Sequence, residues 1–319
     1  MDCTVPSHNV KTFCSAIVSM SKIGKDLYLE FDPLDQGLIL RTINDAKSAF
    51  SAFTFQPTFF ERCVRPPTRK RTQDSDDTYK CRVPLRALQA ITKARKGVVS
   101  MRVRNESSAE QLYLSFEFRI QNRNGDVSHV QHKIGVVDAE GVQAVTDEED
   151  ASELVVVPHR LLQMMEPLKK TNEIALVVNE EAKIVTMSSF HHSSAAPEET
   201  NAVLKTKSAT LLKSETSIGA DDFEEFQYIS NRHVDSNENI PNNVNFEATM
   251  VFTLREPKAM LQFCHSADED LRASIYFHWG GKPIIFETKT ATLSGKLVMA
   301  TLDFKLLRGP GINNQNEEN

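Results

Sequence analysis

The sequence lacks any long apolar run. Nothing in its 319 residues approaches the roughly 18 to 20 consecutive apolar side chains that a membrane-spanning helix needs. The first ten residues, MDCTVPSHNV, also lack the basic and then apolar pattern of a secretory signal. These absences argue against a helical membrane protein and predict an intracellular one.

Cysteine is scarce and scattered. The five cysteines are Cys3, Cys14, Cys63, Cys81 and Cys264, and they form no CxxC pair and no Cys/His cluster with the spacing of zinc ligands. A zinc site is therefore not expected. We interpret Cys14 and Cys264, which fall on apolar helix faces, as buried thiols.

Catalytic motifs are missing as well. There is no G-x-x-x-x-G-K-[ST] loop and no G-x-G-x-x-G, so nucleotide-driven chemistry is not expected. The acidic clusters and the pair His191-His192 lie in polar stretches without a second ligand motif, unlike the paired metal sites of nucleases. These clusters are Asp76-Asp77, Glu148-Glu149-Asp150, Asp221-Asp222 and Asp268-Glu269-Asp270. The sequence thus predicts a protein that is not an enzyme and has no cofactor and no bound metal.

Positive charge is in overall deficit. The chain has 37 Lys and Arg against 43 Asp and Glu, a formal net charge of −6, which argues against a general nucleic-acid binder. A protein can nevertheless be acidic outside and basic on one face, so the positions of the charges decide.

A repeat is present in the chain. Residues 83–89 and 157–163 both read V-P-x-R-x-L-Q, and each closes a short β-like run. Proline suits the first position of a helix, so each segment predicts a strand that turns directly into a short helix. Apolar stripes indicate two further helices, and the four predicted starts lie near residues 10, 84, 158 and 257.

Pairs of β-rich runs with short polar turns follow these helices. Examples are 26–42 (DLYLEF–DPLDQ–GLILRT) and 173–188 (EIALVV–NEEA–KIVTMS), and 98–118 and 274–288 show the same pattern. Four strand–helix–hairpin units predict an α+β fold of two pseudo-symmetric domains, with antiparallel sheets on one side and four short helices on the other. The expected organisation is a domain at 1–140, a connector at 141–152, a second domain at 153–307 and a disordered tail at 308–319.

Each predicted helix offers a basic or neutral polar face. The residues concerned are Lys11, Ser15 and Lys22 at the first helix, Arg86, Gln89, Lys93 and Lys96 at the second, Arg160, Lys169 and Lys170 at the third, and Lys258, Gln262 and His265 at the fourth. One such face is ordinary for a solvated helix. Four of them in an acidic protein favour a surface that holds phosphates by charge without reading sequence.

Several segments carry a family resemblance. The segments are 9–30 (NVKTFCSAIVSMSKIGKDLYLE), 37–50 (GLILRTINDAKSAF), 55–61 (FQPTFFE), 221–227 (DDFEEFQ), 260–267 (MLQFCHSA), 281–286 (GKPIIF) and 297–302 (LVMATL). Their order and spacing resemble the Rad9 family of DNA-damage checkpoint clamp subunits. The resemblance covers nearly the whole chain and is weakest in the polar loops.

The resemblance implies the clamp fold of proliferating cell nuclear antigen (PCNA) and a nuclear protein. It also implies a heterotrimeric ring with two related subunits, which an ATP-dependent clamp loader places around double-stranded DNA at damage or stalled forks. There the ring would recruit checkpoint kinase machinery and repair enzymes without reading the DNA sequence. A homotrimeric replicative clamp has the same fold, and a DNA exonuclease is the competing enzyme class.

The resemblance also implies three sites. A DNA-facing surface would use Lys11, Lys22, Lys25, Arg86, Lys93, Lys96, Arg160 and Lys258. A partner-peptide pocket beneath the connector would use Ile43, Val136, Pro283, Val298 and Ala300. Subunit contacts would be made by strands at the domain edges, roughly 111–118 and 182–190.

Two polar segments leave alternatives open. Arg65, Arg69, Lys70 and Arg71 lie in one loop, which is either a nuclear import signal or a plain solvated loop. Residues 308–319 contain no Ser or Thr, whereas family members carry a long phosphorylated tail. Either the chain is shortened or signalling uses another segment.

Overall fold

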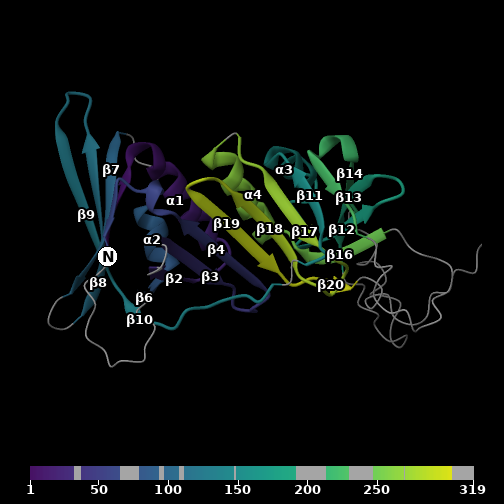
Figure 1. Cartoon of the computed structure of the whole chain (residues 1–319), viewed down its shortest axis with the longest axis horizontal. Helices are drawn as coiled ribbons and strands as arrows, with labels where there is room; N and C mark the ends of the chain where they lie inside the picture. The colour runs from purple at the N-terminus through teal and green to yellow at the C-terminus, as the bar shows by residue number, and fades with distance from the viewer. Residues whose placement is uncertain are drawn as a thin grey trace, which may run out of the picture. The chain divides into compact units, whose positions relative to one another are not determined.

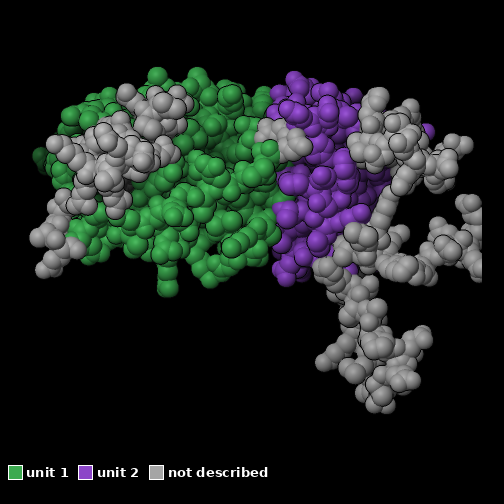
Figure 2. All heavy atoms as spheres, turned by 60° about the horizontal axis from the view of Figure 1, so that its bottom comes forward, with its two compact units in different colours: residues 1–147, 255–275, 285–299 green, residues 148–254, 276–284, 300–319 purple. Residues whose placement is uncertain are grey.

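The chain divides into two compact units, which Figure 2 shows in different colours. The structure, a computed structural model, describes residues 1–31, 37–64, 79–92, 97–107, 111–146, 149–191, 213–229, 247–268 and 270–303. Unit 1 comprises Met1–Asp147, Arg255–Ile275 and Ile285–Met299, and unit 2 comprises Glu148–Leu254, Tyr276–Ile284 and Ala300–Asn319. The domain boundaries expected from the sequence stay a prediction.

Four α-helices begin where the sequence places them. They are α1 (Ser7–Ser21), α2 (Leu85–Ile91), α3 (Pro158–Met165) and α4 (Arg255–Ala267). In the two V-P-x-R-x-L-Q repeats, Pro84 is the N-cap of α2 and Pro158 is the first residue of α3. Proline has no backbone N–H, and at the start of a helix such an N–H would have no acceptor within the helix. Neither proline therefore costs its helix a hydrogen bond. The described residues also contain two short 3₁₀ helices, η1 (Pro57–Phe59) and η3 (Ala220–Asp222).

The first sheet of unit 1 has the order β5-β1-β7-β8-β9, and Figure 1 labels its strands β7, β8 and β9. Its strands are β1 (Asp2–Pro6), β5 (Arg62–Val64), β7 (Val98–Ser107), β8 (Leu112–Gln121) and β9 (Val127–Gly135). Alternate residues such as Val5, Met101 and Phe116 are buried, while Thr4 and Arg102 point to the polar face. This alternation is the pattern of an antiparallel sheet with one face on the core.

The second sheet of unit 1 joins strands that are distant in sequence. Starting from one edge, its strands that lie wholly or partly in unit 1 are β10 (Val137–Asp138), β6 (Tyr79–Pro84), β2 (Asp26–Phe31), β3 (Leu38–Ile43), β4 (Ala49–Phe55), β19 (Leu293–Met299), β18 (Ile284–Lys289) and β17 (Ala273–Phe277). The antiparallel register of β4 and β19 runs from Leu293 opposite Phe55 to Met299 opposite Ala49. Phenylalanines then join sheet and helices, because the ring of Phe53 lies 4.6 Å from that of Phe263 on α4, and Phe55 lies 5.0 Å from Phe13 on α1.

Unit 2 contains a five-stranded sheet of order β14-β13-β12-β16-β20. Its strands are β12 (Glu173–Asn179), β13 (Ile184–Phe190), β14 (Glu215–Gly219), β16 (Glu247–Thr253) and β20 (Leu302–Asp303). The unit also pairs β11 (Ser152–Val156) with β15 (Glu225–Gln227). Helix α3 is tied to β14 because the Thr216 hydroxyl donates a hydrogen bond of 3.0 Å to the carbonyl of Met164.

The sequence-based prediction of which strands lie at the sheet edges was wrong. Segment 111–118 lies in β8, which has β7 and β9 on its two sides, and 182–190 lies in β13, between β12 and β14. Within the described residues, the edges of the two five-stranded sheets are β5 and β9 in unit 1 and β14 and β20 in unit 2. In 111–118 apolar residues occupy every second position from Leu112 to Phe118, but such alternation shows which face is buried and not which strand lies last.

The cysteines differ from expectation in two respects. Cys264 is buried, as predicted, and burial raises its pKa to about 12, whereas Cys14 is only half-buried, with a pKa raised to about 11 by the same cause. Cys3 and Cys63 form a disulfide between β1 and β5 that the sequence did not predict. Thiols in the nucleus are kept reduced, so the predicted nuclear location gave no reason to expect a disulfide.

Candidate nucleic-acid interface

A polar seam joins α1 and α4 in unit 1. Ser15 Oγ lies 2.8 Å from Ser266 Oγ, and the Ser19 hydroxyl donates a hydrogen bond of 2.9 Å to the carbonyl of Ala259. At the end of α1, the Lys22 ammonium donates a hydrogen bond of 2.7 Å to Gln262 Oε1. These contacts fix the side of α1 along which the predicted polar face runs.

The seam brings two predicted DNA-facing residues together. Lys22 and Lys258 are both half-buried, and they lie close enough for their charges to interact. Burial, and then the charge of Lys258, lower the pKa of the Lys22 ammonium below its usual value. Two neighbouring cations repel each other, so an anion such as a phosphate oxygen would stabilise both.

The other predicted cations have varied surroundings. Lys11 on α1 and Arg86 on α2 are exposed, and α1 packs against both α2 and α4 within unit 1. Lys25 is exposed and forms an ion pair with Asp45, whose hydrogen bond raises the pKa of the lysine. Unit 1 thus places four of the predicted cations on or next to α1 and α2, and the fifth on α4.

The other three predicted cations lie in unit 2 or outside the described residues. Arg160 belongs to α3 of unit 2, where its guanidinium lies 3.4 Å from a carboxylate oxygen of Asp222. Lys93 and Lys96 lie outside the described residues, and α2 ends before them at Ile91. The ion partners Asp45 and Asp222 were missed because each comes from a different element, far along the chain or across a turn.

Part of the predicted peptide pocket is a row of side chains across three strands. Ile43 of β3 and Val298 of β19 both stand opposite Phe50 of β4, so all three share one face of the sheet. Phe50 was missed, although the alternation in AFSAFTF at 49–55 indicates which residues share its face. Val136 is buried in unit 1, whereas Pro283 and Ala300 are exposed residues of unit 2.

The predicted connector is anchored on the same sheet of unit 1. Arg41 Nη1 donates a hydrogen bond of 3.0 Å to the carbonyl of Val142. The same guanidinium lies 3.0 Å from Glu30, which also pairs with Lys80 at 3.5 Å. The side chains of Glu30 and Arg41 are only 12% and 14% exposed, so this charge group is largely shielded from water.

Other features from the sequence can be placed only in part. Arg65, Arg69, Lys70 and Arg71, the nuclear import candidates, lie outside the described residues. Within the described ranges, no three His, Cys, Asp or Glu side chains gather in a way that could hold a metal ion. No helix in the described part of the chain is both long and apolar enough to cross a membrane.

Comparison with known proteins gives one family. Residues 13–302 match the family Rad9. The chain is also similar to the cell cycle checkpoint control protein Rad9 of Drosophila melanogaster, with 18% identity over 303 residues that cover 95% of this chain and 57% of that protein. The chain therefore spans a little over half the length of that relative.

Solved structures agree on the fold. PCNA from Thermococcus kodakaraensis matches with a TM-score of 0.65 and 12% identity, covering 94% of this chain and 99% of that one. A. fulgidus PCNA bound to the C-terminal region of FEN-1 matches with a TM-score of 0.56 and 13% identity, covering 94% and 97%. At such identity the likeness concerns the fold, and it confirms the predicted α+β clamp fold.

Proposed function

Because the chain belongs to the Rad9 family, we propose that it is one subunit of a heterotrimeric clamp that encircles DNA. The ring is loaded at damaged DNA or stalled forks in the nucleus, by a separate ATP-dependent loader. There it acts as a platform for checkpoint kinase activation and for repair enzymes, and performs no chemistry itself. The family match over residues 13–302 carries this proposal.

The DNA contact of this proposal rests on α1, α2 and α4. Lys22 and Lys258 at the α1–α4 seam, with exposed Lys11 and Arg86, supply cations that bind phosphate oxygens. In this proposal the cations contact phosphate oxygens and not base edges. Binding is therefore independent of DNA sequence and strongly dependent on salt.

Ring contacts in this proposal use the sheet edges. The free edges of β9 and β14 each present unpaired backbone N–H and C=O groups within the described residues. Addition of a strand from a neighbouring subunit would satisfy these groups and close the edge. These two strands replace the ones that the sequence suggested.

Peptide partners would bind beneath the connector. The structure of A. fulgidus PCNA with the C-terminal region of FEN-1 supports a peptide site on this fold. In this chain the apolar row Ile43, Phe50 and Val298 of unit 1 would form its floor. An apolar floor with a backbone segment above it suits an extended or helical peptide with apolar anchors.

The oligomeric mass of the chain tests the proposal. Light scattering is run on the purified chain alone and on the chain mixed with the two related clamp subunits of the same organism. A monomer that becomes a one-to-one-to-one trimer only with both subunits is expected. A stable homotrimer would instead indicate a replicative clamp, and a monomer in every mixture would reopen the exonuclease hypothesis.

A further inference from the structure

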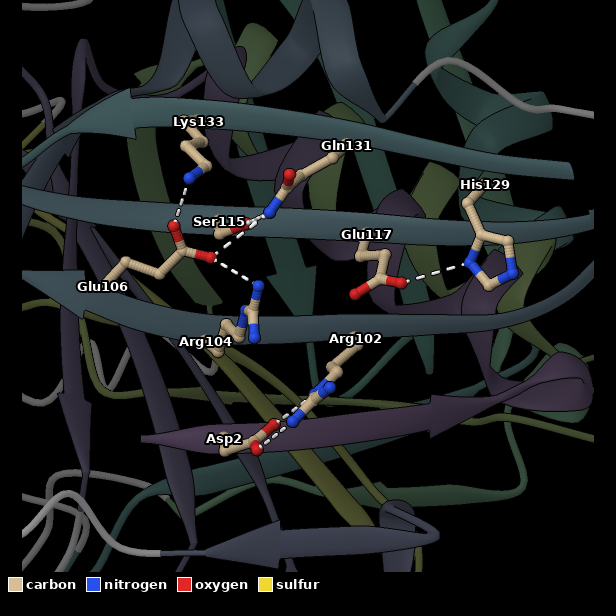
Figure 3. A network of polar contacts seen from close by, with 9 residues as sticks. All are labelled: Asp2, Arg102, Arg104, Glu106, Ser115, Glu117, His129, Gln131 and Lys133. Carbon is tan, nitrogen blue, oxygen red and sulfur yellow. Dashed lines mark hydrogen bonds and ion pairs between the residues drawn. The ribbon is translucent and has the colours of Figure 1, made fainter.

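Glu106 is the centre of a polar network on the outer face of the first sheet of unit 1 (Figure 3). Its carboxylate accepts contacts of 2.7 Å from Arg104 on its own strand β7 and of 2.5 Å from Lys133 on β9. Gln131 of β9 donates a third, of 3.2 Å. The hydrogen bond from Lys133 lowers the pKa of Glu106, so the carboxylate stays ionised.

This network crosses a strand, because β8 lies between β7 and β9. The residue of β8 beneath the crossing is Ser115, which stands opposite both Arg104 and Lys133 in the two registers. Ser115 is fully buried, and its hydroxyl accepts a hydrogen bond of 2.9 Å from Gln131. A small side chain at this position leaves room for Glu106 to reach β9, whereas a branched side chain would stand between them.

The outer side chains of β9 bind carboxylates of strands β7 and β8. Lys133 and Gln131 are bound to Glu106, and His129 lies 3.1 Å from Glu117 of β8. Backbone pairing joins β9 only to β8 within the described residues, so the Glu106 contacts are what ties the strand to β7. Edge strands are among the first parts of a sheet to open, and a link to a second strand opposes that opening.

The edge of β9 also lacks the usual protection. Proteins commonly blunt an exposed edge with proline, with short strands or with lysine whose charge opposes pairing. This edge strand is nine residues long and contains no proline, and its one lysine is neutralised by Glu106. Such an edge is open to addition of another strand.

We propose that Glu106 is a positioning residue for subunit assembly: by holding Lys133 and Gln131 over Ser115, it keeps the free edge of β9 ordered for a strand of the neighbouring clamp subunit. The inference rests on the proposed function, since it takes that subunit as the occupant. An edge that is already ordered loses less conformational freedom when the partner strand binds. The effect of Glu106 is therefore on assembly and on the opening of β9, not on the core.

Ser115→Val tests the proposal without removing any charge. The change removes the hydroxyl that accepts the hydrogen bond from Gln131, and valine favours strands more than serine does. Its branched side chain would nonetheless separate Glu106 from β9. Ser100→Val is the matched control, because Ser100 is a buried serine on the same face of β7 that lies outside the network in Figure 3. Glu106→Ala, which removes the hub, is the second variant.

Two measurements are made on each variant. Hydrogen exchange of the peptide covering 127–135 is followed in the isolated chain, and the dissociation rate from the two related subunits is followed by surface-immobilised binding. Ser115→Val and Glu106→Ala are expected to speed both about five- to tenfold, with Ser100→Val close to wild type.

The outcomes distinguish a failure of the role of Glu106 from a failure of the proposed clamp function. Unchanged exchange in both variants, or faster exchange with unchanged dissociation, overturns the role of Glu106 and leaves the proposed ring intact. A wild-type chain that binds neither subunit overturns the proposed function and, with it, the role of Glu106 in assembly.

Discussion

Lys22 at the end of α1 donates a hydrogen bond of 2.7 Å to Gln262 on α4, 240 positions further along the chain. The contact holds the lysine beside Lys258, where the two charges repel. A phosphate that binds both would relieve this repulsion. The pair is therefore the part of the candidate interface that mutation tests most directly.

Lys22→Gln and Lys258→Gln should each weaken binding to a short DNA duplex about three- to tenfold at low salt. Each change should also reduce the slope of log binding constant against log salt concentration by about one. Fluorescence anisotropy over a salt series measures both quantities. Lys289→Gln, an exposed lysine of β18, is the control and should leave them unchanged. An equal effect in all three variants would show that only net charge matters.

Arg41→Met should destabilise unit 1 and free the connector. The change leaves the shielded Glu30 carboxylate with Lys80 alone and removes the hydrogen bond to Val142, at a cost of about 2 kcal/mol. Urea unfolding measures the loss, and limited proteolysis should cut within 139–146 sooner than in wild type.

Arg82→Met is the matched control for this prediction. Arg82 lies 3.7 Å from Asp26 in an ion pair with 44% and 39% exposed side chains, so its loss should change the free energy of unfolding by less than about 0.5 kcal/mol. Equal losses for the two arginines would mean that Arg41 does not anchor the connector.

Local patterns in the sequence predicted local structure. The repeat V-P-x-R-x-L-Q placed the starts of α2 and α3 because proline at a helix start acts through its own backbone. The pairs β2–β3 and β12–β13 followed from polar turns between alternating runs. The two lysines of the seam were also predicted to be on polar helix faces.

Relations between distant segments were not predictable in the same way. Nothing in the sequence of β4 indicates that it pairs with β19, and nothing in the sequence around Cys3 indicates that it bonds to Cys63. The apolar side chains of strand β9 (VSHVQHKIG) are unevenly spaced, so no alternation marked it as a strand or as an edge. Its order depends instead on side chains such as Glu106, which come from other strands.

Cys63→Ser should lower stability only under oxidising conditions. The disulfide closes a loop of 60 residues, and the entropy of such a loop corresponds to about 4 kcal/mol. Serine suits the half-buried position of Cys63 better than the fully buried position of Cys3. Thermal unfolding with and without a phosphine reductant measures the effect. The variant should match reduced wild type, and a difference between these two would assign the loss to packing.

Gly295→Ala should destabilise the core of unit 1 by about 1–3 kcal/mol. An added Cβ at this position of β19 would lie 2.6 Å from Phe53 Cε1, and Phe53 is itself held by the ring of Phe263. Gly219→Ala is the control, because no atom lies within 4 Å of an added Cβ there. Urea unfolding of both variants checks the prediction, which fails if the two changes cost the same.

The α-amino group of Met1 should make the chain more stable at pH 8 than at pH 6. Burial lowers the pKa of this amine from 8.0 to about 6. Between these values the unfolded chain binds more protons than the folded one, so stability rises with pH, and the penalty is complete below pH 6 and absent above pH 8. The expected rise is about 1 kcal/mol, since solvent screens a partly buried amine. Urea unfolding at about pH 5.5 and about pH 8.5 is compared for the free and the N-terminally acetylated chain. Titrating histidines affect both forms alike, so a rise of equal size in the two would show that the amine does not contribute.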